Sequence, residues 1–282
     1  MTLLELKNVG FRYPLAKEPC LRRINLKVEE GEFVGITGRN GVGKTTLCNI
    51  IRRIIPEFID GELRGEILYK GKPLSSYSRG ELAKEIGFVF QNPFVQISGI
   101  KKTVYEEIGY SLENLGVERS EIKRRIDEIM NLLKIEHLKD KHPKKLSGGQ
   151  SQLVALASVL IMKPRLLLVD EPTSQLDPVG TEMVFEALKI VKGTDTTVIL
   201  VEHKVDLISE YVNRVVVLNE GMVVCDGPNN EVFSNLEIEN YGVEVPSVTK
   251  LAYELKSKGY PIENIPTNLK DAEIEFRKVL KI

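Results

Sequence analysis

Short hydrophobic runs alternate along the chain with polar and glycine-containing segments, a pattern typical of strands separated by helices and loops. Residues 166–170 (LLLVD) and 198–202 (VILVE) are almost uniformly apolar, as expected for parallel strands that are covered on both faces of a sheet. These runs predict an α/β fold. The expected strands are residues 3–9, 25–28, 33–37, 66–69, 87–90, 166–170, 197–202, 214–218 and 223–226.

Helical periodicity follows several of these runs. Between Asn92 and Pro164 the pattern changes to amphipathic helical segments (SLENLG, SEIKRRIDEIMNLLKI and SQLVALASVL) with no strand among them. This change predicts a helical subdomain inserted into the sheet domain. The helices expected next to strands are residues 44–54, 180–191 and 204–211.

The last part of the chain again reads as helices without strands, in VPSVTKLAYELKSKG and TNLKDAEIEFRKVL. Gly259 is expected to end the first of these helices, and Thr267 is expected to cap the second. We therefore predict a domain over residues 1–228, with its helical subdomain at about 92–164, and a C-terminal helical extension over residues 229–282.

A phosphate-binding loop is indicated by GRNGVGKTT, residues 38–46, which matches G-x-x-x-x-G-K-[ST] between an expected strand and an expected helix. Its glycines let backbone N–H groups converge on the β- and γ-phosphates of a nucleotide without interference from Cβ atoms. Lys44 supplies a positive charge, and the Thr45 hydroxyl can ligate Mg²⁺. The predicted binding residues here are Asn40, Gly41, Gly43, Lys44, Thr45 and Thr46.

Two carboxylates, Asp170 and Glu171, end the apolar run in RLLLVDEP. At the carboxyl edge of a parallel sheet they would face the crevice where ligands bind. Asp170 is placed to hold Mg²⁺, directly or through water, and Glu171 to orient or deprotonate an attacking water. Acidic pairs at strand ends are common, so the phosphate loop is what gives this pair its interpretation.

A second segment suited to anion binding lies at LSGGQ. Here Ser147, Gly148, Gly149 and Gln150 begin an expected helix whose apolar residues recur at helical spacing. The unpaired N–H groups and the dipole at a helix N-terminus favour negative charge. The alternative is that Ser147 only caps its own helix beside a tight glycine turn, and local physics alone favours this alternative.

Composition narrows the class of function. With 39 basic and 40 acidic residues the net charge is -1, which does not indicate a nucleic-acid binder. The three cysteines are scattered and show no metal or disulfide spacing, as expected in a reducing compartment. The first residues do not read as a signal peptide, and the longest apolar stretch, residues 153–162, is about half of what spans a bilayer. Any work at a membrane is therefore expected to go through a partner.

These motifs, in this order, resemble the nucleotide-binding subunit of ATP-binding-cassette (ABC) transporters over about the first four fifths of the chain. The resemblance implies a P-loop ABC ATPase fold, with a RecA-like, mostly parallel core sheet, an antiparallel β subdomain and the inserted helical subdomain. It also implies ATP and Mg²⁺ as ligands, with ADP after turnover. The further residues that it implicates are Tyr13 of FRYP, stacked on adenine; Gln91 of FVFQNP, on Mg²⁺ or the attacking water; Asp177 of SQLDP, in the D-loop along the partner subunit; and His203 of ILVEH, on the γ-phosphate.

The same resemblance implies that LSGGQ does not serve the nucleotide of its own chain. Two cassettes would pair head to tail, so that Ser147, Gly148, Gly149, Gln150 and Asp177 would contact ATP bound to the second subunit. ATP then holds the dimer together, and hydrolysis weakens it because ADP lacks the γ-phosphate. The second subunit could be an identical chain or a related ATPase.

A narrower resemblance, carried by FRYP, GFVFQNPxxQ, SLENLGV and the tail GVEVPSVTKLAYELKSKG, is to the ATPase (A) components of energy-coupling-factor (ECF) transporters. It implies a peripheral subunit at the cytoplasmic face of the membrane that works with a membrane T component and, through it, a substrate-capturing S component. The transported substrate would be a vitamin or a metal ion. Phe94 and Val95 stand where the family usually has acidic residues, and Leu153 where it usually has Arg or Lys.

Other classes stay open at this stage. A soluble ABC ATPase of ribosomes, DNA repair or chromosomes would usually carry two cassettes or a long coiled coil, and neither is visible. A GTPase or kinase would not account for LSGGQ, and the guanine-reading N-K-x-D pattern is absent. A cassette that binds ATP only as a clamp is disfavoured by Glu171 and His203, while Leu153 keeps it open.

Overall fold

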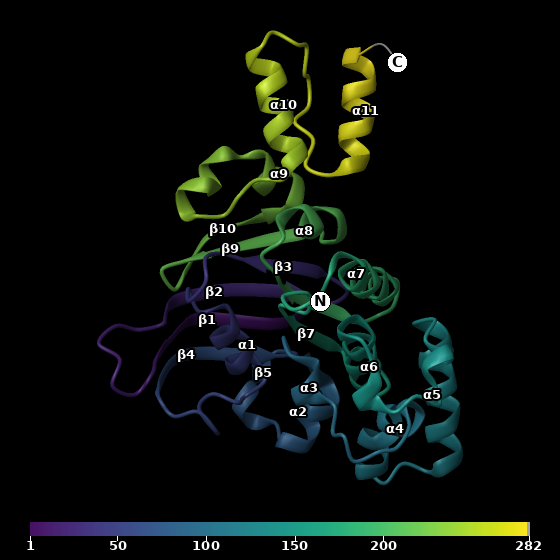
Figure 1. The fold of residues 1–282 in the computed structure, drawn as a ribbon. Coiled ribbons are helices and arrows are strands. Elements are labelled where there is room, and N and C mark those ends of the chain that lie inside the picture. Colours follow the sequence, from purple (N-terminus) through teal and green to yellow (C-terminus); the bar gives the residue numbers. More distant parts are fainter. Residues whose placement is uncertain (281–282) are drawn as a thin grey trace. The chain divides into compact units, whose positions relative to one another are not determined.

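The computed structural model describes residues 1–280 (Figure 1). It divides into two compact units, each described by itself below: unit 1, made of Met1–Leu74 and Val201–Ile282, and unit 2, made of Ser75–Leu200. The last two residues of the expected C-terminal extension, 281–282, lie outside the described residues.

Unit 1 contains a four-stranded antiparallel sheet, as predicted. Its strands are ordered β2 (Leu21–Glu29), β1 (Thr2–Arg12), β4 (Glu62–Tyr69) and β5 (Lys72–Pro73). Along β2 the apolar positions are buried and the positions between them are mostly exposed, because successive side chains of a strand point to opposite faces. The alternation continues past the predicted ends, so β1 is longer than residues 3–9.

A second set of strands in unit 1 carries the phosphate loop. β3 (Phe33–Thr37) is parallel to β9 (Arg214–Asn219), and β10 (Met222–Pro228) is antiparallel to β9. Every residue of β3 is buried, as its uniform apolar pattern predicts. The loop after β3 leads into α1 (Lys44–Ile51), and α8 (Val205–Tyr211) packs against β3.

The C-terminal helices pack within unit 1 as α9 (Asn229–Ser234), η4 (Leu236–Tyr241), α10 (Ser247–Ser257) and α11 (Leu269–Leu280). Ser247 at the start of α10 donates its backbone N–H and its hydroxyl to the Asp206 carboxylate of α8, at 2.7 and 3.0 Å. Gly259, with φ +88°, ends α10 as predicted.

The capping of α11 differs from the sequence prediction. The Asn268 side-chain oxygen accepts from the Asp271 backbone N–H at 2.9 Å, so Asn268 and not Thr267 caps this helix. Thr267 is instead buried, and its hydroxyl donates to the Asn229 side chain at 3.4 Å. The prediction of Thr267 was wrong because two adjacent residues can both cap, and packing decides between them.

One contact ties this C-terminal part to the phosphate loop. Gly242, which follows η4 with φ +72°, lies under the side chain of Arg39. A Cβ atom at this position would lie 1.8 Å from Arg39 Nε, so a larger residue would strain the backbone angle and would also displace the Arg39 side chain.

Unit 2 contains β6 (Ile86–Val89), β7 (Leu166–Asp170) and all but the last residue of β8 (Thr197–Val201). These strands are buried along their length, and β6 is parallel to β7. The parallel pairs in both units confirm the predicted α/β class. Helices α2 (Arg79–Glu85) and α7 (Pro178–Lys192) accompany these strands. The segment predicted as a helical insertion holds α3 (Pro93–Gln96), α4 (Val104–Asn114), α5 (Arg119–Leu132) and α6 (Gly148–Leu160), with no strand described among them. The boundaries of the domain, its helical subdomain and the extension stay predictions.

Arg214 joins the two sets of strands of unit 1. Its guanidinium donates to both carboxylate oxygens of Asp226 at 2.6 and 2.7 Å, to the Lys27 carbonyl of β2 at 2.8 Å and to Glu32 at 3.2 Å. The hydrogen bonds to Asp226 raise the pKa of Arg214 above its ordinary value, although partial burial opposes this. Planar, bidentate pairing of this kind is specific to arginine.

We therefore expect Arg214→Lys to lower the free energy of unfolding by about 1–3 kcal/mol, because lysine keeps the charge but cannot reach all of these acceptors. Urea unfolding measures the change. Arg22→Lys is the matched control, since Arg22 pairs at 3.2 Å with a Glu18 side chain that is 77% exposed, and such exposed pairs contribute little. Equal effects of the two substitutions would contradict the bridging role of Arg214.

Candidate functional site

The phosphate loop of unit 1 is shaped by its contact with β9. Gly38 has φ +145°, and a Cβ atom there would lie 2.2 Å from the carbonyl oxygen of Leu218. Only glycine therefore lets the chain turn from β3 into the loop at this point. Asn40, Gly41 and Thr45 are exposed around the loop.

Lys44 is held inside this loop and is 4% exposed. Its ammonium donates to the carbonyl oxygens of Gly38 and Arg39, both at 3.0 Å. A buried ammonium is stable only with partners, and these carbonyls fix it over the loop before any anion binds. The arrangement places a positive charge among the backbone groups of the loop, as the binding of a phosphate group requires.

Tyr13 lies beside the same helix. Its hydroxyl is 2.9 Å from the hydroxyl of Thr46, in the first turn of α1, and its ring packs edge-on against Phe11 with centroids 4.8 Å apart. A hollow of about 500 Å³ opens at Tyr13 and the residues that follow it. The structure thus brings Tyr13 and Thr46 together, which their separation in sequence does not reveal.

His203, also in unit 1, is oriented by its neighbour Glu202. The Glu202 carboxylate is 2% exposed and accepts from the backbone N–H groups of His203 and Lys204 at 2.9 and 3.3 Å. The Glu202 N–H donates to the Ile36 carbonyl at 3.2 Å, which fixes this turn to the end of β3. We did not single out Glu202 from the sequence, although a buried carboxylate just before a histidine at a strand end is a usable signal.

Unit 2 brings together Gln91 and Glu171, which are 80 residues apart in sequence. The Gln91 side-chain amide donates to the Glu171 carboxylate at 3.0 Å. Glu171 has φ +44°, a left-handed conformation that costs a non-glycine residue roughly 1–3 kcal/mol and that concentrates at functional sites. Asp170, the last residue of β7, is 4% exposed beside it. At the end of this strand the Glu171 carboxylate is therefore held in a fixed position, next in sequence to the buried Asp170.

Ser147 caps its own helix, as the local alternative predicted. Its hydroxyl accepts from the Gln150 N–H at 3.3 Å, and the Gln150 side chain accepts from the Ser147 N–H at 3.3 Å. This is a reciprocal capping box. A hydroxyl that accepts one hydrogen bond still has a proton to donate, so capping and binding an anion are compatible.

The starts of α6 and α7 meet at two glycines. A Cβ atom on Gly149 would lie 2.7 Å from the Cα atom of Gly180, and the Asp177 side chain caps α7 by accepting from the Gly180 N–H at 2.7 Å. The LSGGQ and SQLDP segments are thus held as one piece within unit 2. Leu153 in α6 is 3% exposed, so at this position the helix has an apolar packing residue.

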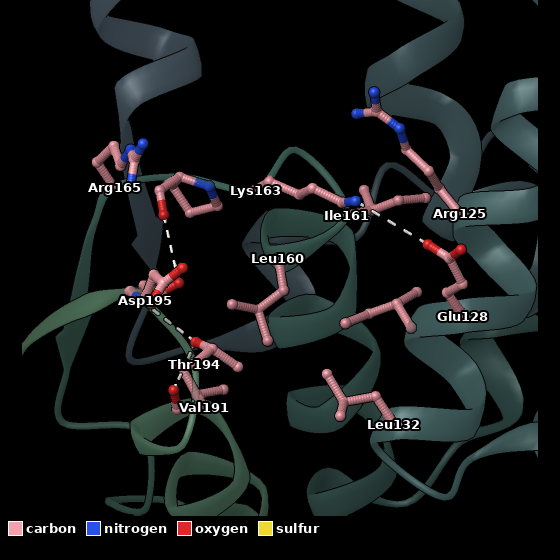
Figure 2. A pocket seen from close by; sticks show the side chains of 13 residues that line it. Arg125, Glu128, Leu132, Leu160, Ile161, Lys163, Arg165, Val191, Thr194 and Asp195 are labelled. Atoms are coloured by element: carbon pink, nitrogen blue, oxygen red, sulfur yellow. Dashed lines mark hydrogen bonds and ion pairs between the residues drawn. The ribbon is translucent and has the colours of Figure 1, made fainter. Parts of the chain in front are cut away.

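A pocket of about 580 Å³ lies elsewhere in unit 2, between α5 and the C-terminal ends of α6 and α7 (Figure 2). Ile129, Leu160 and Ile161 line it, and an ion pair of Lys163 with Glu128 at 4.0 Å lies at its edge. None of the predicted site residues lines this pocket, so the motifs and not this pocket identify the candidate site.

Two absences hold for residues 1–280. No helix there is both long enough and apolar enough to cross a bilayer. No group of three or more His, Cys, Asp or Glu side chains there is arranged to hold a metal ion.

Comparisons with known proteins agree with this geometry. The family described as ABC transporter matches residues 21–174. A protein of Pyrococcus abyssi named as an ABC transporter ATP-binding protein is 44% identical over 261 residues, which are 92% of this chain and 92% of that protein. The structure of cbiO1 from Clostridium perfringens, described as part of the ABC transporter complex cbiONQ, is similar with a TM-score of 0.76 and 32% identity, over 93% of this chain and 99% of that chain. The cassette MJ0796, a dimer with ADP and phosphate, has a TM-score of 0.69 and 29% identity, over 80% of this chain and 99% of that chain.

The contact of α6 with α7 leads to a prediction about Gly180. A Cβ atom there would lie 2.9 Å from the Asp177 carboxylate and 3.2 Å from the Cα atom of Gly149, so Gly180→Ala should separate the helices. We expect a loss of about 1–3 kcal/mol in the free energy of unfolding, measured by denaturant titration. Gly80→Ala in α2 is the control, because its Cβ meets nothing within 4 Å and alanine favours helix. A Gly180→Ala variant as stable as the Gly80→Ala variant would refute the close contact.

Proposed function

Because this chain belongs to the ABC transporter family as an ATP-binding subunit that hydrolyses ATP to drive transport, we propose that it powers an ECF-type transporter for a vitamin or a metal ion. The observation that carries the proposal is the similarity to cbiO1, which covers 93% of this chain, whereas MJ0796 covers 80%. The additional coverage fits a likeness that continues past the cassette into the C-terminal helices.

ATP binding is proposed to centre on the phosphate loop. The N–H groups of Asn40, Gly41, Gly43 and Thr46 would bind the β- and γ-phosphates together with the Lys44 ammonium. The Tyr13 ring would stack on adenine, with its hydroxyl kept in place by Thr46.

Mg²⁺ is proposed to accompany ATP and to neutralise charge on its phosphates. Its protein ligands would be the Thr45 hydroxyl, Gln91 and Asp170, all of them oxygen donors of the kind that Mg²⁺ prefers. With no larger carboxylate cluster among the described residues, the remaining ligands would be phosphate oxygens and water.

Hydrolysis is proposed to use Glu171 as the general base. Its carboxylate would accept a proton from the water that attacks the γ-phosphorus, and the bond from the γ-phosphorus to the bridging oxygen would break to give ADP and phosphate. Gln91 holds this carboxylate at 3.0 Å, and His203, oriented by Glu202, would donate to the γ-phosphate.

The motifs that remain are proposed to act on a second subunit, identical or related. Ser147, Gly148, Gly149 and Gln150 would offer the N-terminus of α6 to the γ-phosphate of ATP bound by that subunit, and Asp177 would lie along it. The joined starts of α6 and α7 support this, because both segments would approach the partner as one surface. Loss of the γ-phosphate would then loosen the dimer.

Attachment to the membrane is proposed to use the apolar side chains near α3. Phe94, Val95 and Ile100 are 57, 69 and 70% exposed, so their apolar side chains are available to a partner. A membrane T component would dock here and link the ATPase to an S component, at the cytoplasmic face of the membrane.

The catalytic role of Glu171 is tested by Glu171→Gln. The variant should bind ATP with normal affinity but turn it over at least about 100-fold more slowly, because the amide cannot take the proton from water. It should also accumulate as a dimer in ATP, measured by size-exclusion chromatography. Glu182→Gln, at an exposed position on α7, is the control and should behave as the wild type. Near-normal turnover of Glu171→Gln would remove the residue from this role.

The docking surface is tested by replacing Phe94 and Val95 with lysine, which removes the exposed apolar side chains and is opposite in charge to the acidic residues usual in the family at these positions. Purification from native membranes should then recover the ATPase with much less T-type membrane subunit than the wild type, while ATP hydrolysis by the purified protein is unchanged. Leu15→Lys, at an apolar side chain that is fully exposed, controls for the added positive charge. Recovery of ribosomal proteins in place of a membrane subunit would refute the transporter assignment.

A further inference from the structure

The backbone of Phe90, just before Gln91, is held by two glutamine side chains of unit 2. Its N–H donates to the Gln96 side-chain oxygen at 3.1 Å. Its carbonyl oxygen accepts from the Gln152 side-chain nitrogen at 3.1 Å. We call this pair of side chains the amide clamp. Because β6 ends at Val89, the polar groups of Phe90 have left the sheet and need other partners.

The amide clamp also fixes this loop to α6. The Gln96 side-chain nitrogen donates to the Ala155 carbonyl of α6 at 3.0 Å. A carbonyl oxygen has two lone pairs, so it can accept this bond in addition to one from a helical N–H group. Gln152 lies on α6 itself, one turn before Ala155. Both glutamines therefore connect Phe90 to the helix that begins at LSGGQ.

Burial makes Gln152 unusual among these contacts. The residue is 1% exposed, and its side-chain oxygen has no hydrogen-bond partner among the described residues. Burying an unpaired amide oxygen is unfavourable, and an apolar residue of the same size would avoid that cost. The donor nitrogen, which holds Phe90, is the part of this side chain that an apolar residue could not replace.

The other end of the loop is anchored separately. Glu107 of α4, 4% exposed, accepts from the Ser98 N–H at 2.6 Å and from its hydroxyl at 2.9 Å. Phe94 and Val95 thus lie on a short segment that is fastened on both sides. Because both sides of the segment are held by hydrogen bonds, we expect a displacement of Phe94 and Val95 to move Phe90 and the Gln91 side chain as well.

We propose that Gln152 and Gln96 are positioning residues for ATP hydrolysis, which hold Gln91 against Glu171 and couple it to the signature helix α6. The route is continuous: α6 contacts Phe90 through the amide clamp, Phe90 precedes Gln91 in the chain, and Gln91 donates a hydrogen bond of 3.0 Å to Glu171. Displacement of α6 by a partner's nucleotide would therefore change the position of the Gln91 amide. The inference rests on the catalytic role proposed for Glu171.

The experiment compares Gln152→Met with Gln152→Glu in the full chain. Methionine has similar shape but no donor, so kcat for ATP should fall about tenfold at every pH, which corresponds to about 1.4 kcal/mol of barrier. A buried glutamic acid has a raised pKa, and its protonated form can donate to the Phe90 carbonyl. Gln152→Glu should thus approach wild-type kcat at about pH 6 and lose activity as the pH rises and the acid ionises. Ionisation of the buried acid should also lower the melting temperature of Gln152→Glu as the pH rises. Thermal melts must therefore show at each pH that both variants are folded at the assay temperature, and the Kd for ATP should stay near the wild-type value.

A double variant separates positioning from general support. If Gln152 acts through Gln91, then adding Gln152→Met to Gln91→Ala should change kcat by less than twofold, because the group to be positioned is already gone. The same tenfold loss in both backgrounds would overturn the proposal, and so would Gln152→Glu with a flat pH profile identical to that of Gln152→Met.

Failure of the clamp and failure of the catalytic assignment give different results. If Glu171→Gln is inactive while both Gln152 variants match the wild type, the amide clamp alone is refuted. If Glu171→Gln turns over normally, the role proposed for Glu171 is refuted whatever the Gln152 variants do.

Discussion

Backbone polar groups must find partners where strands of the core end, and in this protein side chains meet that requirement. The amides of Gln96 and Gln152 satisfy Phe90 after β6, and the Glu202 carboxylate satisfies the turn after β8. Asp177 does the same for the start of α7. Each such bond also fixes the direction in which a neighbouring residue of the candidate site points. The side chains that satisfy the backbone are thus adjacent to the residues proposed to bind or hydrolyse ATP. Replacing one of these side chains is therefore expected to change the position of a site residue.

The elements and motifs that depend on local pattern were predictable from the sequence. The phosphate loop follows from its glycine spacing between a strand and a helix, and the buried strands follow from uniformly apolar runs such as LLLVD. The capping box at Ser147 was also accessible, because Ser and Gln are spaced three residues apart. In these cases the residues that make the structure are neighbours in the chain.

The contacts that join distant segments were not predictable in this way. Nothing in the spacing of Gln91 and Glu171, or of Phe90 and Gln152, indicates that they meet, because that depends on how β6, β7 and α6 pack. The cap of α11 was not predictable either, although the two candidate residues are adjacent. Thr267 is buried by packing, and Asn268 caps the helix instead. The structure also shows the surroundings of the residues that depart from the family pattern. Leu153 is a buried packing residue, whereas Phe94 and Val95 are apolar and exposed.

The contact of the Arg39 side chain with Gly242 links the C-terminal tail to the phosphate loop. One side chain of the phosphate loop lies on a backbone segment that precedes α10, at a distance that leaves no room for a Cβ atom unless the arginine moves. A recombination event that grafted a foreign tail onto this cassette would have to bring a glycine to the same place, or else displace an arginine from the loop. The residue at position 242 and the conformation of the Arg39 side chain are therefore coupled, so a change in this part of the tail would affect the phosphate loop.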